Sequence, residues 1–228
     1  MTDPTPAASV TERLDGLRTS IDDQGRRVFD LVLQAVEAYF DADVPKAEGV
    51  VRDDDEIDRI DVEIERACIG ALRQRLDGEH EIRTVLTIVK VNNELERIAD
   101  LAVTVAEAVI AGESTGPATF RVMANSVIGM LRDSIRALAD GNVDLARQVL
   151  RFDDTVDEFK GQILSDARDG VAEDRVEIGV AFRLLAVTKA VERIADHCTN
   201  ICEQVIYLQS GKIVRHRPEG WSEPESPA

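Results

Sequence analysis

The sequence predicts an all-α fold, and three observations lead to this prediction. Aromatic residues supply only 4% of the 228-residue chain, whereas 44% is hydrophobic and Ala, Val, Leu, Ile, Glu, Arg and Asp dominate. This composition suits long helices better than sheets. Apolar residues recur at steps of three and four almost everywhere, and no segment keeps the alternation of a strand.

The first helix is expected at residues 9–40, because one apolar stripe runs through this segment. Only the region of Gln24 and Gly25 weakens the stripe. Its members are Leu14, Leu17, Ile21, Val28, Leu31, Val32, Ala35 and Tyr39.

Five short breaks separate the later helices, and each is rich in the turn formers Gly, Asn, Asp and Pro. The breaks lie at residues 41–45, 77–79, 112–117, 140–142 and 170–174. The helices between and after them are expected at 45–77, 80–111, 118–140, 143–170 and 174–210. Asn142 is placed to cap the start of the fifth helix, and Gly112 and Gly211 are placed to close two others.

The sequence also repeats itself. A shift of 96 residues places the segment from Glu96 to Asp100 on the segment from Glu192 to Asp196, and both read Glu-Arg-Ile-Ala-Asp. We therefore expect two pseudo-symmetric three-helix bundles, at residues 10–112 and 117–211. A flexible N-terminus at 1–9 and a loose tail at 212–228 should flank them.

The formal net charge of −17 narrows the choice of partners. A strongly acidic protein surface repels nucleic acid and attracts metal cations or the basic surfaces of partner proteins. Residues 1–9 do not resemble a signal peptide and no stretch is apolar enough to span a bilayer, so we expect a cytoplasmic protein without membrane insertion. Cys68, Cys198 and Cys202 do not form a secreted disulfide framework, and the latter two are expected in the core.

Pairs of acidic residues four positions apart are the candidate metal sites. Residues at this spacing share one helix face and repel each other unless a cation lies between them. The candidate ligands are Asp54 with Asp58, Glu96 with Asp100, Asp153 with Asp157, and Glu192 with Asp196, extended by Asn200. Oxygen ligands suit hard cations, so Fe, Mn, Mg or Zn remain open. The alternative is that these residues form a solvent-exposed acidic face that binds no metal, with Arg97 and Arg193 as counterions.

Catalytic motifs are missing from the sequence. It contains no phosphate-binding glycine loop, no nucleophile elbow, and no Glu-x-x-His pair of the ferritin-like type. We therefore expect a protein that is not an enzyme. A carboxylate-bridged metal enzyme on a helical bundle is kept as an alternative.

The segment from Glu192 to His216 resembles the C-terminal signature of the PhoU family, and Glu94 to Asp100 resembles its first-repeat signature. The resemblance implies two three-helix bundles, a homodimer, and metal ions on paired acidic motifs. It further implies negative regulation of phosphate uptake, through contacts with the ATPase subunit of the phosphate ABC transporter and with a sensor histidine kinase. Regulation of a different transporter is an alternative, and so is a plain scaffold that binds no metal.

One departure separates the two repeats. Thr104 occupies the place that Asn200 has in the second repeat. Because an amide offers a carbonyl oxygen where Thr104 offers only a hydroxyl, we expect the second-repeat site to bind metal more tightly.

Overall fold

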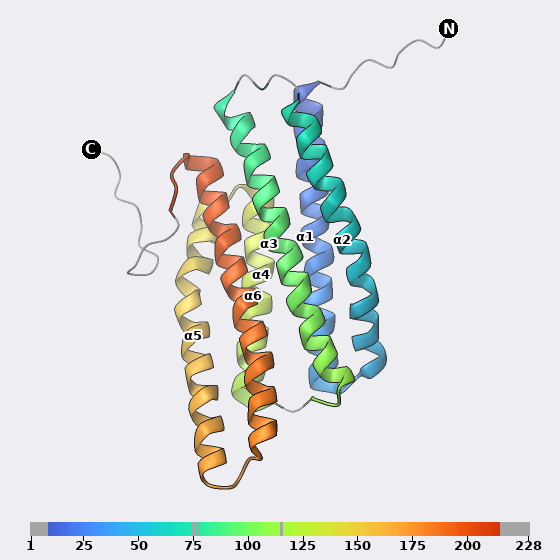
Figure 1. Ribbon diagram of the computed structural model, residues 1–228. Coiled ribbons are helices and arrows are strands. Elements are labelled where there is room, and N and C mark those ends of the chain that lie inside the picture. The colour runs from blue at the N-terminus through green and yellow to red at the C-terminus, as the bar shows by residue number, and fades with distance from the viewer. Residues whose placement is uncertain (1–8, 74–75, 77, 115, 215–228) are drawn as a thin grey trace, which may run out of the picture.

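A computed structural model describes residues 9–73, 76, 78–114 and 116–214. These residues form six α-helices and no strand (Figure 1). The helices are α1 Val10–Asp41, α2 Val44–Leu72, α3 Glu79–Ile110, α4 Ala118–Asp140, α5 Val143–Ala172 and α6 Ile178–Ser210. The predicted all-α fold is therefore confirmed.

The helices pack as two groups of three. In the first group, α1, α2 and α3 all contact one another, and in the second α4, α5 and α6 do the same. The groups meet through α3 against α6 and α1 against α4. Figure 1 shows them side by side, with α3 and α6 adjacent along the middle.

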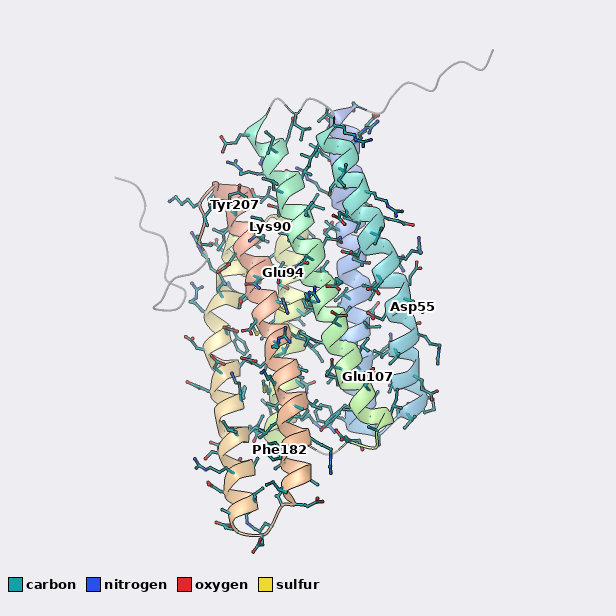
Figure 2. The ribbon with its side chains drawn as sticks, viewed as in Figure 1. Asp55, Lys90, Glu94, Glu107, Phe182 and Tyr207 are labelled. Carbon is teal, nitrogen blue, oxygen red and sulfur yellow. The ribbon has the colours of Figure 1, made fainter. Side chains whose placement is uncertain are left out.

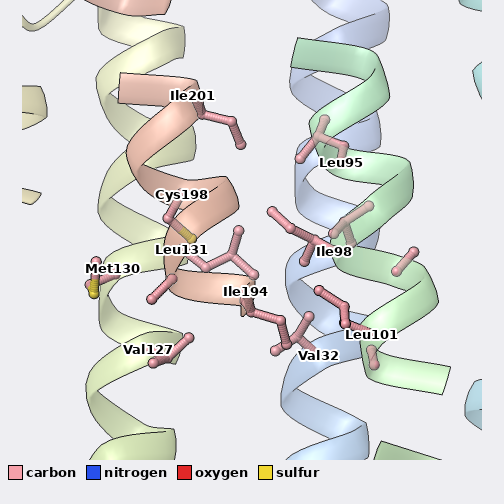
Figure 3. Close-up of a cluster of buried hydrophobic side chains, with 14 of the residues drawn as sticks. Val32, Leu95, Ile98, Leu101, Val127, Met130, Leu131, Ile194, Cys198 and Ile201 are labelled. Atoms are coloured by element: carbon pink, nitrogen blue, oxygen red, sulfur yellow. The ribbon is translucent and has the colours of Figure 1, made fainter. Parts of the chain in front are cut away.

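A single hydrophobic core joins the two groups (Figure 3). Val32 of α1, Ile98 of α3, Leu131 of α4 and Ile194 of α6 all lie in it and are almost completely buried. Burying one such side chain stabilises a fold by about 1.5–3 kcal/mol. The shared core thus fixes the two bundles relative to each other.

Both ends of the described chain are held in place. Ser9, expected in the flexible N-terminus, caps α1 through a capping box with Glu12. Val214, expected in the loose tail, is buried in the core after the left-handed turn at Gly211. The rest of both predicted flexible segments lies outside the described residues.

The first two helices of each group are joined by the same turn. Ala42 and Gly141 adopt left-handed conformations at the ends of α1 and α4, with φ of 54° and 61°. The next residue caps the following helix: Asp43 accepts from the backbone of α2, and Asn142 from that of α5. The predicted caps at Asn142 and Gly211 are confirmed, while Gly112 follows the end of α3 with a positive φ.

Two predicted helix boundaries were wrong. α2 ends at Leu72 instead of residue 77: the N–H of Arg73 makes the last helical bond, to the carbonyl of Ile69, and residues 76 and 78 are not helical. α6 starts at Ile178 instead of residue 174, because the backbone N–H groups of Arg175 and Val176 both donate to Gly170 and hold a turn there. Gly170 also lets Val176 approach, since a Cβ would lie 2.8 Å from its methyl group.

No helix in the described part of the chain is long and apolar enough to cross a membrane.

Candidate functional site

The first acidic site lies where α2 packs against α3. Asp54 and Asp58 stand one turn apart on α2, and Glu96 and Asp100 stand one turn apart on α3. The Oδ1 atom of Asp54 is buried and has no hydrogen-bond partner among the residues that the structure describes. Burial raises the pKa of Asp54 to about 6, and the charges of Asp58 and Asp100 add to the effect. Carboxylates from both helices therefore act on one another here.

Arg97, which is exposed to solvent, is the counterion of the acidic pair Glu96 and Asp100 on α3. Its guanidinium lies 3.2 Å from a Glu96 oxygen and 3.3 Å from an Asp100 oxygen. Burial and the charge of Asp100 nevertheless raise the pKa of Glu96, while Arg97 opposes them. Exposed ion pairs of this kind contribute less than about 1 kcal/mol. The counterion thus compensates the site only in part.

The second acidic site repeats this arrangement between α5 and α6. Asp153 and Asp157 stand one turn apart on α5, and Glu192 and Asp196 stand one turn apart on α6. Burial, followed by Asp196 and Asp157, raises the pKa of Asp153 to about 6. Burial and the charge of Glu192 raise the pKa of Asp196. Each of the two predicted sites therefore holds one aspartate, Asp54 or Asp153, whose pKa is raised to about 6.

Lys160 distinguishes the second site from the first. Its Nζ donates to Glu192 at 2.7 Å and lies 3.5 Å from an Asp157 oxygen. The hydrogen bond to Glu192 is the main reason that the pKa of Lys160 rises. An ammonium group from the protein itself thus bridges the two helices that carry this site.

The first site has an acid where the second has this lysine. The shift that places Asp54 on Asp153 places Asp61 on Lys160. Asp61 accepts a hydrogen bond of 2.6 Å from Asn92 on α3, and burial raises its pKa. The α2–α3 contact is therefore bridged by an amide, and the first site keeps its negative charge.

The carboxylates of each site do not converge on one point. In the ranges that the structure describes, no group of three or more His, Cys, Asp and Glu side chains is arranged to hold a metal ion. The predicted ligands are close enough to alter each other's pKa, and one acceptor atom of Asp54 is unpaired within the described part of the chain. A cation fits this chemistry if side-chain rotation brings the oxygens together.

Asn200, predicted as a ligand of the second site, bonds across to the other bundle. Its Nδ2 donates to Oε2 of Glu94 on α3 at 3.0 Å, and Nδ1 of His197 lies 2.6 Å from the same oxygen. This cluster links α3 to α6, and the sequence analysis missed it. The one signal was a break in the repeat, since the 96-residue shift places Glu94 on Ala190 and Leu101 on His197.

Cys198 and Cys202 were predicted as core residues, and this is confirmed. Both are completely buried, and burial raises their thiol pKa values well above the usual range. Figure 3 places Cys198 among apolar side chains of α4 and α6. A buried thiol of this kind is a poor metal ligand, because the thiolate form is disfavoured.

Comparison with known proteins identifies the family. The sequence matches the PhoU domain over residues 21–109 and again over residues 120–205. The chain belongs to the PhoU family. The two matched segments cover most of α1 to α3 and of α4 to α6, so each group of three helices corresponds to one PhoU domain.

Relatives within the PhoU family align over most of their length. A "Phosphate-specific transport system accessory protein PhoU homolog" from Clostridium acetobutylicum is 33% identical over 207 residues, covering 88% of this chain and 94% of the relative. A protein of the same description from Pseudomonas aeruginosa is 33% identical over 208 residues, covering 89% of this chain and 86% of the relative. The PhoU protein of Escherichia coli is 29% identical over 207 residues, covering 89% of this chain and 86% of the relative.

Solved structures of PhoU proteins share the fold. The crystal structure of PhoU from Pseudomonas aeruginosa superimposes with a TM-score of 0.85 at 31% identity, covering 90% of this chain and all of that one. PhoU from Streptococcus pneumoniae, at 24% identity, superimposes with a TM-score of 0.84 and covers 91% of this chain.

Proposed function

We propose that this chain is an accessory protein of phosphate transport that restrains phosphate uptake and phosphate-regulon signalling. The observation that carries the proposal is the double match to the PhoU domain. Relatives that align over most of the chain are described as accessory proteins of the phosphate-specific transport system.

The chain acts by contact with other proteins. Its partners are the ATPase subunit of the phosphate ABC transporter and a sensor histidine kinase, and it works as a cytoplasmic homodimer. The net charge of −17 supports basic partner surfaces, because opposite charges speed association. If the partner surfaces are basic, association rates fall as the salt concentration rises.

Metal ions belong to this proposal. Asp54, Asp58, Glu96 and Asp100 would hold one ion or cluster, and Asp153, Asp157, Glu192 and Asp196 a second. Burial, and after it the charges of neighbouring carboxylates, raise the pKa values of Asp54 and Asp153, and a bound cation would oppose both effects by favouring the charged form. It would also tie α2 to α3 and α5 to α6, because each site takes ligands from two helices. The ion is therefore proposed to stiffen the surface that partners meet.

The alternative of a metal enzyme is less well supported. Di-iron enzymes on helical bundles use Glu-x-x-His pairs, which the sequence lacks. His197, the histidine next to Asp196, bonds to Glu94 on α3. Binding without catalysis is therefore the proposed mode of action, and oxygen-dependent turnover by the iron-loaded protein would contradict it.

Deleting the gene in its own organism tests the proposed pathway. In phosphate-rich medium the deletion strain should express phosphate-responsive genes that the parent represses, and the wild-type gene should restore repression. Unchanged expression would assign the chain to a different transporter. Sedimentation of the purified protein would show in parallel whether it is a dimer.

A further inference from the structure

A groove lies between α4 and α5 in the second bundle. We name it the α4–α5 groove; it has a volume of about 300 Å³, and its lining includes Ser126, Gly129, Met130, Asp133, Val149 and Phe152. Met130 and Val149 are buried, whereas Phe152 is 40% exposed. The groove is distinct from the second acidic site, which takes its residues from α5 and α6. It therefore offers an apolar surface that the proposed metal binding does not use.

A groove at the same place in the first repeat has the opposite character. It lies between α1 and α2, has a volume of about 260 Å³, and its lining includes Arg27, Asp30 and Asp53. The second repeat has a different residue at each of these positions, 99 places along the chain: Ser126, Gly129 and Phe152. Contact between the first two helices of a repeat thus tolerates charged side chains there. Helix packing therefore does not require the apolar character of the α4–α5 groove.

Exposed apolar surface continues along α4 beyond the groove. Val122 stands one turn before Ser126 and is 49% exposed. Removal of apolar surface from water is the dominant favourable term in most association, and aromatic rings also pack well against one another. An occupant with an aromatic side chain would therefore gain most by covering Phe152.

The chain carries a side chain of this kind beyond the residues that the structure describes. Trp221 is its only tryptophan, and it lies seven positions after Val214, where the described part ends. The segment from 218 to 228 contains three glutamates and no basic residue. It is therefore an acidic segment with one aromatic residue.

Net charge favours α4 as the surface for an acidic segment. α4 contains three arginines and two aspartates. Each of the other five helices that the structure describes is neutral or carries a negative net charge. Because the whole chain has a net charge of −17, an acidic segment is repelled by most of the surface and least beside α4.

The segment is long enough to reach the groove. The start of α5 lies beside the end of α6, since a Cβ on Gly141 would lie 2.5 Å from the Gln209 amide nitrogen (Figure 1). Val149 follows eight positions after Gly141, which is about 12 Å along α5 at 1.5 Å per residue. An extended chain spans about 3.3 Å per residue, so Trp221 can lie about 23 Å from Val214. That distance is enough to pass around one helix, about 10 Å across, and to run down to Val149.

We propose that the C-terminal segment of this chain folds back onto the α4–α5 groove, with Trp221 packed against Phe152, Met130 and Val149. The glutamates on either side of Trp221 lie along α4, where the net charge is positive. The occupied groove is closed to other proteins, so a partner segment must displace the tail before it can use this surface. The inference goes beyond the proposed function and does not depend on which transporter the chain serves.

Tryptophan fluorescence tests this contact directly, because Trp221 is the only tryptophan of the chain. The full chain in EDTA is compared with a synthetic peptide of residues 215–228. Trp221 in the full chain should emit at a shorter wavelength than in the peptide, and acrylamide should quench it less. Equal emission and quenching in the chain and the peptide would overturn the proposal.

Two substitutions give the second groove the residues of the first. Gly129→Asp and Phe152→Asp should each shift the emission to that of the peptide and remove the protection from acrylamide, because each adds a carboxylate to the apolar surface. Both variants should fold, since Phe152 is partly exposed and a Cβ on Gly129 would have no described side chain within 4 Å. Circular dichroism checks their helicity.

Gly161→Asp and Leu164→Asp are the matched controls on α5, outside the groove. A Cβ on Gly161 likewise has no described side chain within 4 Å, and Leu164 is 51% exposed. Both add the same charge and should leave emission and quenching as in the wild-type chain. The same shift in all four variants would reduce the effect to net charge and overturn the proposal. Protection that survives both groove substitutions would place Trp221 on another surface and overturn it as well.

Dilution distinguishes the chain's own tail from that of a second copy. A contact within one chain does not depend on protein concentration, so the emission should stay constant as the protein is diluted. A shift toward the emission of the peptide on dilution would assign the groove to the tail of a second copy and overturn the intramolecular contact.

Discussion

The two acidic sites have the same predicted ligands but different surroundings. In the first repeat, Asp61 accepts from Asn92 and adds another acid between α2 and α3. In the second repeat, Lys160 takes that position and donates to Glu192. A metal entering the second site must compete with an ammonium group already there. Matching motifs therefore do not make equivalent sites.

This comparison reverses one expectation from the sequence. Asn200 was expected to make the second site the tighter one, but its amide bonds to Glu94 of the other bundle. With Lys160 beside Glu192 as well, we now expect the first site to bind metal more tightly.

The largest expected effect is on metal content. Asp100→Ala should lower the metal that copurifies with the protein at least about tenfold at the first site, because it removes one of the proposed ligands. Asp196→Ala should change the total much less. Elemental analysis of protein purified without chelators, with helicity checked for each variant, measures the difference. Equal metal in both variants and wild type would mean that these carboxylates are only a solvated face.

Substitution of the bridging lysine sharpens the comparison. Lys160→Met should raise the affinity of the second site for Mn²⁺ about fivefold, since a half-exposed ion pair contributes ~1 kcal/mol. Asp61→Lys should lower the affinity of the first site. Titration calorimetry of both variants gives the two values. An unchanged Mn²⁺ affinity in Lys160→Met would contradict the expectation that Lys160 competes with metal at the second site.

A smaller effect is expected on stability as the pH changes. Asp54 and Asp153 have pKa values of about 6 in the folded chain and about 3.9 when unfolded. The folded state therefore gains stability from them as the pH falls from above 6 toward 4, and loses it as the pH rises through 6. Because both groups are partly exposed, we expect on the order of 1 kcal/mol for each.

Urea denaturation in EDTA at pH 5 and pH 7.5 measures this pH dependence. Asp54→Asn should reduce the pH dependence most, while Asp55→Asn, which is exposed on α2 and is a smaller contributor to the raised pKa of Asp54, should reduce it less (Figure 2). Greater stability of the wild-type protein at pH 7.5 than at pH 5, with Asp54→Asn showing the same trend, would contradict the assignment.

The smallest effect concerns the turn that both repeats share. The first repeat places Ala42 in the left-handed conformation where the second has Gly141. Ala42→Gly should stabilise the protein by up to about 1 kcal/mol, because glycine adopts this conformation without strain. Gly141→Ala should destabilise it by a similar amount, since a residue with a Cβ is strained at the φ of 61° that Gly141 adopts. Thermal unfolding tests both, and a lower midpoint for Ala42→Gly would contradict the expectation.

Most of the fold followed from local sequence signals. Apolar spacing and turn formers gave six helices, and caps such as Asn142 were visible because their chemistry is local. The start of α6 was missed because the turn there depends on packing of Val176 over Gly170. That contact cannot be inferred from the order of residues alone.

The candidate site was predictable only in part. The acidic pairs could be named because spacing of four residues fixes a helix face. The residues that contact these acidic pairs could not be named from the sequence, since Lys160 on α5 bonds to Glu192 on α6, and Glu94 in the first bundle bonds to Asn200 in the second. Interactions over such separations depend on which faces meet. A comparison of the repeats position by position would have marked both residues as exceptions.

The shared core has a consequence for how the protein is made. During synthesis α1, α2 and α3 leave the ribosome first, but α1 and α3 still lack the apolar partners that α4 and α6 bring. The apolar surface of α1 and α3 therefore stays exposed to solvent until α4 and most of α6 have been synthesised. Completion of α6 closes contacts made by residues about a hundred positions apart, which is a slow kind of contact to form. The protein should thus be most exposed to proteases and chaperones in the seconds before its final helix docks.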